Sequence, residues 1–518
     1  MTPEAIPSLS DLVLTEVPST DKQPSALPSP LFSVEQIKAM ECDFASVNKT
    51  TTFLLMQRAG TAAFNLMRQL WPNEKHIVVL CGKGNNAGDG FILALLAAQA
   101  SLRVDVVELF PDHQPKNDSA LAYQALKEHF PGTLNAKIAD LENCDLIVDA
   151  MLGTGLRGKL SEPIAGVIKH ANASGLPIFS LDIPSGLHAD TGSAPSGAVN
   201  AQATVSFIGL KKGMVTADGL NHCGDIYLNT LDALPGNSEE IAEALWSKCV
   251  HYRSHWPRRL PNSHKGHFGH LAVVAGSPGL LGAARLSASS ALRLGAGLVS
   301  VGTHPEQAIM VNANQPELMV FPLDEATKYW QKSFRAVVVG PGLGQDAWAF
   351  RQWQEALALG LPCVLDADAL NFLAQEKRNN ENWVLTPHPG EAARLLNSST
   401  EAVQSDRFLA AKTIVRQYGG VCVLKGAGTI IATQSETHVL AHGHPAMATA
   451  GMGDVLAGAI GALLAQGLGV QQAALLGCLV HSASAEHYIN QMGPHGLVAS
   501  EIVTAMPKLL NEWERECQ

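Results

Sequence analysis

The sequence predicts a two-domain α/β protein in which each domain has a mostly parallel sheet between layers of helices. Short apolar runs alternate with helical stretches along nearly the whole chain, which is the order expected of strand, helix, strand units. Apolar residues make up 46% of the sequence and charged residues 16%, with 46 glycines, as expected when strands are buried on both faces. At 518 residues the chain exceeds what a single hydrophobic core supports, so we expect two large domains.

The first domain is expected to span residues 32–245, after a mobile tail over residues 1–31. The tail holds several prolines and serines and shows little apolar periodicity. Helices are expected over residues 34–45 and 51–71, where apolar residues recur every three or four positions. Five short apolar runs are expected to form strands, and they begin at His76, Arg103, Asp145, Pro177 and Ala203.

The second domain is expected to span residues 257–518, after a linker over residues 246–256. The linker mixes charge, histidine, tryptophan and proline, a composition typical of an interdomain segment. Two apolar segments over residues 454–466 and 471–489 indicate packed helices. Six short apolar runs indicate strands, and they begin at His270, Gly297, Ala336, Pro362, Trp383 and Gly420.

Charge and composition exclude several classes of function. The formal net charge is −11 and basic residues form no extended cluster, so nucleic-acid binding is not expected. The chain has no run of about 18 apolar residues, and its first thirty residues fit neither a signal peptide nor an arginine-rich transit peptide. Nine cysteines without CxxC spacing indicate a reducing compartment. We expect a cytoplasmic protein that acts on small molecules and does not bind membranes.

Three loops of the first domain carry the residue types of a ligand site. GKGNNAGDG at residues 82–90 joins a strand to a helix, a geometry that lets backbone N–H groups approach phosphate. Asp149 and Asp182 each end a strand, and ligands of open α/β sheets bind at that edge. Asn86, Asp149 and Ser185 offer oxygen atoms to a cation, while Asp182 could exchange a proton with a substrate. The alternative is that these polar residues only cap turns.

The second domain ends its strands in a comparable set of loops. GMGDVLAG at residues 451–458 follows KGAGT at residues 425–429, and glycines at a helix start favour phosphate binding. Asp454 is placed to take a proton from a hydroxyl that attacks a phosphoryl group. The alternatives are a glycine-capped helix without a ligand and, for His388, a histidine satisfied within its own turn. Three further loops at strand ends are GPGLG at 340–344, DADALN at 366–371 and TPHPGE at 386–391.

The loop GKGNNAGDG, the run VDAMLGTGLRG from Val148 and LDIPSG from Leu181 resemble the signature of the NAD(P)H-hydrate epimerase family over about residues 33–245. The resemblance implies a Rossmann-like fold, a bound potassium ion, and interconversion of the R and S forms of NADH or NADPH hydrated at C6. It implies that Asn86, Asp149 and Ser185 hold potassium and that Asp182 is the acid/base residue. It also implies that the substrate contacts Asp182 together with Asn85, Asn86, Ala87, Gly88, Asp89, Gly153, Thr154, Gly155, Leu156, Arg157, Gly158 and Lys159. Ala87 stands where the family usually has glycine, and an alanine there would be strained if the turn needs a positive φ.

HKGHFG from His264 and the five glycine-rich or acidic loops of the second domain resemble the ADP- or ATP-dependent NAD(P)H-hydrate dehydratases, a ribokinase-like family, across about residues 257–512. The resemblance implies that Ala283, Gly342, His388 and Asp454 contact the hydrated nucleotide and that Mg²⁺ accompanies ADP or ATP. Asp454 would act as the base that lets the C6 hydroxyl be phosphorylated, because phosphate leaves more easily than hydroxide. The residues implied around the adenine nucleotide are Lys425, Gly426, Ala427, Gly428, Thr429 and Gly453.

The two resemblances together predict a bifunctional repair enzyme. The first domain would epimerise the R and S hydrates, NADHX and NADPHX, and the second would dehydrate the S form while ADP becomes AMP and phosphate, with ATP as the other possible donor. Family resemblance also favours a homo-oligomer. The alternative is a ribokinase-like small-molecule kinase whose N-terminal domain binds a nucleotide without catalysis.

Overall fold

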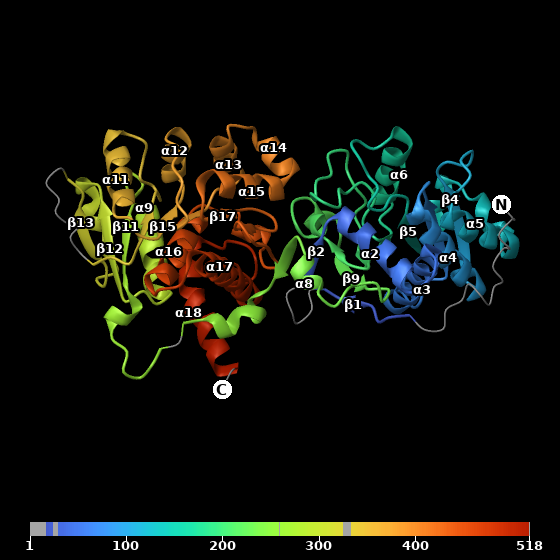
Figure 1. Cartoon of the computed structure of the whole chain (residues 1–518), viewed down its shortest axis with the longest axis horizontal. Helices are drawn as coiled ribbons and strands as arrows, with labels where there is room; N and C mark the ends of the chain where they lie inside the picture. The colour runs from blue at the N-terminus through green and yellow to red at the C-terminus, as the bar shows by residue number, and fades with distance from the viewer. Residues whose placement is uncertain (1–16, 24–28, 258, 325–332, 517–518) are drawn as a thin grey trace. The chain divides into compact units, whose positions relative to one another are not determined.

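We describe the protein from a computed structural model that covers residues 17–23, 29–257, 259–324 and 333–516. The chain divides into two compact units between Trp246 and Ser247. Each unit contains a sheet with helices on both faces, so the predicted α/β class is confirmed for both (Figure 1). Within the described ranges, no helix is both long enough and apolar enough to cross a membrane.

The first unit contains β1 (Asp21–Lys22), β2 (Ser29–Phe32), α2 (Val34–Val47), α3 (Thr52–Leu70), β3 (His76–Cys81), α4 (Asn85–Gln99), β4 (Arg103–Glu108), α5 (Asp118–His129), β5 (Leu146–Ala150), α6 (Glu162–Ala173), β6 (Ile178–Leu181), β7 (Ala203–Phe207), β8 (Leu210–Lys211), α7 (Gly219–His222), β9 (Asp225–Asn229), α8 (Ser238–Ile241) and β10 (Ala244–Ser247). All five strands predicted for this unit are present, as β3 to β7. The main sheet has the order β1-β9-β7-β6-β5-β3-β4 and is parallel except at β1.

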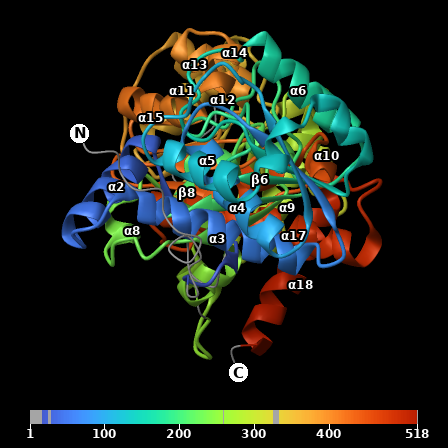
Figure 2. The same ribbon diagram turned by 90° about the vertical axis from the view of Figure 1, so that its right-hand side faces the viewer.

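Alternation along β3 divides the core of the first unit into two layers. Ile77 and Val79 pack with α3, α4 and α5 on one face, while Val78 and Leu80 pack with α6 on the other. Figure 2 shows α3, α4 and α5 together on the near face of this unit. The helix α2 begins at a capping box, because Ser33 Oγ accepts from Gln36 N and Gln36 Oε1 accepts from Ser33 N.

The second unit contains β11 (His270–Val274), α9 (Leu281–Arg293), β12 (Leu298–Thr303), α10 (Ala308–Val311), β13 (Met319–Pro322), β14 (Ala336–Val339), α11 (Ala347–Ala358), β15 (Cys363–Leu365), α12 (Asp368–Gln375), β16 (Trp383–Leu385), α13 (Pro389–Leu396), α14 (Thr400–Ser405), α15 (Arg407–Tyr418), β17 (Val421–Leu424), β18 (Ile430–Ala432), β19 (Thr437–Leu440), α16 (Met452–Ala465), α17 (Val470–Met492) and α18 (Ala499–Glu516). Within this unit the strand order is β13-β12-β11-β14-β15-β16-β17-β18-β19, parallel up to β17 and antiparallel beyond it. The six predicted strands and the two predicted helices, α16 and α17, are all present.

The structure differs from the sequence prediction at the expected tail and linker. β1 pairs with β9, and β2 pairs with β10 and β8, so residues 21–22 and 29–31 of the expected tail form strands. Leu31 and Phe32 are fully buried, and this apolar pair fixes β2 within a proline-rich stretch. Residues 1–16 and 24–28 of the expected tail lie outside the described residues. The expected linker is also structured, because β10 ends at Ser247 and a 3₁₀ helix spans Cys249–His255.

Each sheet reverses its strand order beside the predicted loops. In the first unit the reversal lies between β3 and β5, and in the second it lies between β11 and β14. At such a reversal the loops that follow the two strands diverge and leave a crevice at the carboxyl edge of the sheet. The topology therefore places one candidate site in each unit.

Candidate functional sites

A cavity of about 560 Å³ lies at the carboxyl edge of the first sheet. Its walls come from α2, α3, the loop after β3, the loop after β5 and the end of β6. Of the residues predicted to contact substrate, the cavity lining includes Asn85, Asn86, Asp89, Gly153, Thr154, Gly155, Leu156 and Asp182. Arg157, Gly158 and Lys159 are exposed and lie outside that lining.

Ala87 and Gly88 are not part of the cavity lining. Both are buried in the first turn of α4, and a Cβ at Gly88 would lie 2.5 Å from Met56 Sδ. Ala87 has no positive φ, so the strain considered for an alanine at this position is absent. The residue is part of a right-handed helix, where alanine is the most favourable residue.

Asp182 has a strained backbone and a buried cationic partner. Its φ is +65°, a region that side chains other than glycine rarely adopt, and its N–H donates to Val205 O at 2.7 Å. One carboxylate oxygen, Oδ1, accepts a hydrogen bond from Lys211 Nζ. Lys211 Nζ is fully buried and also donates to Ser206 Oγ and Phe207 O, each at 3.0 Å. Sequence reasoning missed Lys211, because nothing local to it signals a carboxylate partner on another strand.

Two more carboxyl groups face Asp182 in the same cavity. Burial raises the pKa of Asp89 well above its usual value, and the charges of Asp182 and Glu41 raise it further, while Lys211 opposes them. Burial also raises the pKa of Glu41, with a further contribution from Asp182. The cavity thus gathers three carboxyl groups around one buried ammonium.

The three residues predicted to hold potassium differ in how fully they are hydrogen-bonded. Asp149 is fully buried and accepts from Ser185 Oγ at 2.6 Å, Ser185 N at 2.8 Å, Ser180 Oγ at 2.9 Å and Met151 N at 3.2 Å. Burial raises the pKa of Asp149, and these hydrogen bonds oppose that rise. The amide of Asn86, by contrast, is buried with no hydrogen-bond partner among the described residues for either its oxygen or its nitrogen.

The unpaired amide is available to a ligand, because leaving both of its polar atoms unsatisfied costs about 1 to 3 kcal/mol for each group. Asn86 begins α4 directly after β3, and Asp149 lies on the neighbouring strand β5, where it pairs with Leu80. The donor set therefore fits a cation or a polar substrate group at Asn86, with Asp149 as a buried negative charge tied to Ser185.

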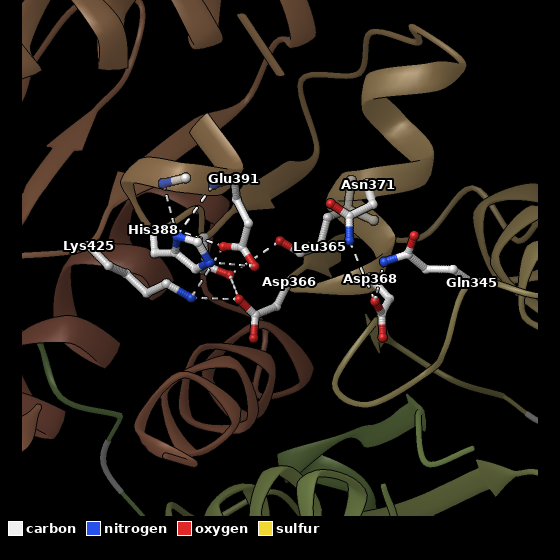
Figure 3. Close-up of polar contacts among 10 residues, drawn as sticks. Gln345, Leu365, Asp366, Asp368, Asn371, His388, Glu391 and Lys425 are labelled. Atoms are coloured by element: carbon white, nitrogen blue, oxygen red, sulfur yellow. Dashed lines mark hydrogen bonds and ion pairs between the residues drawn. The ribbon is translucent and has the colours of Figure 1, made fainter. Parts of the chain in front are cut away.

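In the second unit the strand-end loops converge on a buried ion pair (Figure 3). Lys425 Nζ donates to Asp366 Oδ1 at 2.8 Å and lies 3.9 Å from Glu391 Oε2. Asp366 also accepts from Thr386 Oγ1 at 2.8 Å. Burial acts to lower the pKa of Lys425, but Asp366 and Glu391 together raise it above its usual value, so the lysine remains an ammonium. Sequence reasoning placed Lys425 in the nucleotide loop but did not foresee its two carboxylate partners.

Asp454 completes this cluster from the first turn of α16. Burial raises its pKa to about 7; Asp366 and Glu391 add to the rise and Lys425 opposes it. A carboxyl group whose pKa lies near physiological pH can accept a proton from a substrate and retain it. Gly453 lies against the pair, since a Cβ there would be 3.1 Å from Lys425 Nζ and 3.6 Å from Asp366 Oδ2. The glycine leaves room beside the charges that a side chain would fill.

The KGAGT loop at residues 425–429 is held by a buried arginine. Arg407, 1% exposed, donates to Leu424 O at 3.2 Å, Lys425 O at 3.4 Å and Gly428 O at 3.4 Å. Burial lowers the pKa of Arg407 to about 10, so the guanidinium stays charged at neutral pH. Its five N–H donors suit several carbonyl acceptors at once. Arg407 is a second residue that sequence reasoning missed, because the acceptors that it binds in the loop are backbone carbonyls.

His388, Ala283 and Gly342 have clear local roles. His388 caps α13: its Nδ1 accepts from Gly390 N at 3.0 Å, and its Nε2 faces Glu391 Oε1 at 3.5 Å while the ring is half exposed. Gly342 has φ +53°, and a Cβ there would lie 3.1 Å from Ala283 Cβ. These contacts bring the loop after β14 against the start of α9, at the strand-order reversal. Figure 3 also shows Asp368 binding Gln345, which anchors the GPGLG loop.

Comparisons with known proteins match both units. Residues 53–213 match a family described as YjeF-related protein N-terminus, and residues 271–508 match a family described as NAD(P)H-hydrate dehydratase. The chain is 40% identical to a bifunctional NAD(P)H-hydrate repair enzyme Nnr of Escherichia coli, over 95% of this chain and 96% of that protein. It is 39% identical to the enzyme of the same description from Coxiella burnetii, over 93% of this chain and 99% of that protein.

A solved structure is also similar to part of the chain. It is an ADP/ATP-dependent NAD(P)H-hydrate dehydratase from Bacillus subtilis co-crystallized with ATP and Mg²⁺, 30% identical, covering 52% of this chain and 98% of that chain with a TM-score of 0.48.

Proposed function

The chain belongs to the bifunctional NAD(P)H-hydrate repair enzymes, and from this membership we propose how its two sites divide the reaction. The first unit carries the epimerase activity and the second the dehydratase activity. We assign the epimerase site to the 560 Å³ cavity around Asp182 and the dehydratase site to the cluster of Lys425, Asp366, Glu391 and Asp454. The match along 95% of the chain to a repair enzyme leaves the kinase alternative without support.

The position of Asp454 at the start of α16, beside Lys425, Asp366 and Glu391, carries the dehydratase assignment. With a pKa of about 7, Asp454 takes the proton of the C6 hydroxyl as the oxygen attacks the terminal phosphoryl group of the nucleotide. The ring nitrogen then expels the phosphate, and loss of a proton from the adjacent ring carbon restores the reduced nicotinamide. Lys425 is fixed by Asp366 with its ammonium beside Gly453, where it can neutralise charge on the transferred group.

The nucleotide loop assignment rests on Arg407. By holding the carbonyls of residues 424, 425 and 428, it orients the loop that we assign to ADP or ATP. Bound Mg²⁺ would neutralise phosphate charge. Among the described residues no three His, Cys, Asp or Glu side chains form a metal cluster. Lys425 already faces Asp366 and Glu391. The residues therefore fit an ion carried by the nucleotide phosphates.

The epimerase assignment rests on the cavity and its carboxyl groups. Asp182 Oδ2 is the oxygen that faces Gly153, since a Cβ on that glycine would lie 3.2 Å from it, and we assign it to proton exchange with the substrate. Asn86, with Asp149 and Ser185, would hold potassium, which would supply positive charge beside the substrate. A cytoplasmic location and a homo-oligomeric state remain predictions.

The deciding experiment follows the absorbance of reduced nicotinamide recovered from a mixture of R and S hydrates. It compares ADP, ATP and no nucleotide. Recovery that depends on a nucleotide and exceeds the S fraction, faster than spontaneous epimerisation, supports both assignments and identifies the donor. Recovery that stops at the S fraction contradicts the epimerase assignment, and no recovery with either nucleotide contradicts the dehydratase assignment.

A further inference from the structure

Three carboxyl groups line the cavity of the first unit, and the buried ammonium of Lys211 lies behind one of them, so the carboxyl groups are not equivalent. Only Asp182 contacts the ammonium of Lys211 directly, through Oδ1. Asp89 and Glu41 line the same cavity, and the negative charge of Asp182 raises the pKa of both. Neither has an ion-pair partner of its own among the described residues. Lys38 also acts on Glu41, whereas the cation that acts on Asp89 is Lys211, which contacts Asp182 instead, so we expect Asp89 to retain a proton.

The ammonium of Lys211 is buried and fully hydrogen-bonded. It has no exposed side-chain surface, and its three N–H donors match three acceptors, which are Asp182 Oδ1, Ser206 Oγ and Phe207 O. The buried ammonium therefore has a hydrogen-bond acceptor for every donor and a carboxylate beside it. Its backbone is fixed by the pairing of β8 with β2, where Lys211 faces Phe32.

We propose that Lys211 sets the distribution of protons in this cavity: it holds Asp182 ionised as the base and leaves Asp89 protonated as the acid of the epimerisation. In this assignment Asp182 and Asp89 are catalytic residues, and Lys211 is a positioning residue that acts through Asp182. The proposal rests on the proposed epimerase function and specifies its proton donor and acceptor. Burial and neighbouring negative charge raise the pKa of Asp89, which supports the same distribution.

The proton transfers balance for a substrate whose C6 carries a hydroxyl and is bonded to the ring nitrogen. Asp182 takes the hydroxyl proton, a C6 carbonyl forms, and the bond between C6 and the ring nitrogen breaks as that nitrogen takes the proton of Asp89. Rotation of the open chain presents the other face of the carbonyl. The nitrogen then attacks C6, its proton returns to Asp89, and the new hydroxyl takes the proton of Asp182. No oxidant, reductant or further reactant is needed.

The surroundings of Asp89 allow this role. The titratable groups that act on it are Asp182 from the end of β6, Glu41 from α2 and Lys211 from β8. The other charged side chains of the cavity wall are Lys38, Lys83 and Asp118. Lys83 places its ammonium over the Phe110 ring at 3.9 Å, and Asp118 accepts a hydrogen bond from Thr52. Asp182 Oδ2 accepts no hydrogen bond within the described part of the chain, so it is open to the substrate hydroxyl.

The test measures epimerisation against pH by chromatographic separation of the R and S hydrates, with no nucleotide present so that the dehydratase is silent. The wild-type full-length chain should give a bell-shaped profile, with an acid limb from Asp182 and an alkaline limb from Asp89. Lys211→Met should move the acid limb to higher pH by about one unit or more, which corresponds to about a tenfold or greater loss of rate at pH values below that limb. Asp89→Asn should lose a factor of about 10² to 10⁴ in kcat and the alkaline limb with it.

Matched controls separate this role from a structural one. Lys212→Met removes the neighbouring lysine and its ion pair with Glu243, and should leave both limbs in place. Dehydration of the S hydrate by the same chain, measured with a nucleotide, reports that each variant is otherwise intact. If Lys211→Met does not fold, Ser206→Ala should give a smaller shift of the acid limb in the same direction, because it removes one acceptor of the ammonium.

A direct measurement of the protonation of Asp89 and Asp182 tests the proposal separately from the epimerase assignment. Carboxyl ¹³C resonances of labelled aspartate, assigned with the Asp89→Asn and Asp182→Asn variants, should show Asp89 protonated and Asp182 ionised at pH 7. Ionised Asp89, or an acid limb that Lys211→Met leaves unmoved, overturns the proposal. A wild-type chain that does not epimerise overturns the epimerase assignment, while the resonances still decide which carboxyl group carries the proton.

Discussion

Replacing Asp454 by asparagine is expected to stabilise the second unit while it removes the dehydratase activity. The native carboxyl group has a pKa of about 7 against 3.8 when unperturbed, because it is buried beside Asp366 and Glu391. The folded state therefore binds this proton more tightly than the unfolded state does. The stability associated with it is fully present below pH 3.8 and is lost as the pH rises towards 7. Asparagine carries no charge at any pH, so the variant does not lose stability as the pH rises.

The size of the effect follows from linkage. A shift of about 3 pKa units corresponds to about 4 kcal/mol when the group is fully ionised. Between pH 5 and pH 8 the difference in unfolding free energy between variant and wild type should grow by about 2 kcal/mol, once solvent screening of a partly exposed group is allowed for. For a unit of this size that is about 4 to 8 °C in Tm.

The assay is differential scanning calorimetry of wild type and Asp454→Asn at pH 5 and pH 8. The transition of the second unit is recognised because ADP or ATP raises it. Glu514→Gln, at an exposed carboxylate on α18, is the control and should change the free energy by no more than about 0.5 kcal/mol at either pH. Dehydration of the S hydrate by Asp454→Asn should fall by a factor of at least about 10². A Tm difference that does not grow with pH would refute the reasoning about this cluster.

Three further predictions address the remaining contacts. Arg407→Met should raise the KM for the nucleotide about tenfold in steady-state assays, because freeing the carbonyls it binds costs about 1 to 3 kcal/mol; an unchanged KM would contradict its role in the loop. Gly82→Ala should lower the Tm of the first unit by several degrees and leave dehydration unchanged, because the new Cβ would lie 1.9 Å from Met151 O. The control is Gly166→Ala, whose Cβ would meet nothing within 4 Å and which should not destabilise the unit. Asn86→Ala should abolish any activation of epimerisation by K⁺ over Na⁺; activation that persists would exclude this amide as a ligand.

Secondary structure was predicted correctly where a segment has a clear apolar pattern of its own. The runs that became β3 and β11 are apolar and β-branched, and a glycine-rich loop follows each. The helices α16 and α17 are apolar over more than three turns, longer than a strand would be. The strands β18 and β19 were not predicted; they are joined by short turns and pair antiparallel, unlike the parallel strands that alternate with helices. The strand β2 was not predicted either, and its Leu31 and Phe32 are fully buried.

The sequence by itself determined the two α/β units, the strands and helices that have a clear apolar pattern, and the loops that carry Asp182 and Asp454, because each of these depends on residues close together in the chain. Only the tertiary structure decided which groups share a charge environment. Lys211 reaches Asp182 from another strand, and Lys425 meets Asp366 and Glu391 from a separate loop. Burial and Coulomb interactions act through space rather than along the chain, so the protonation of these carboxyl groups could be assigned only once the fold had brought them together.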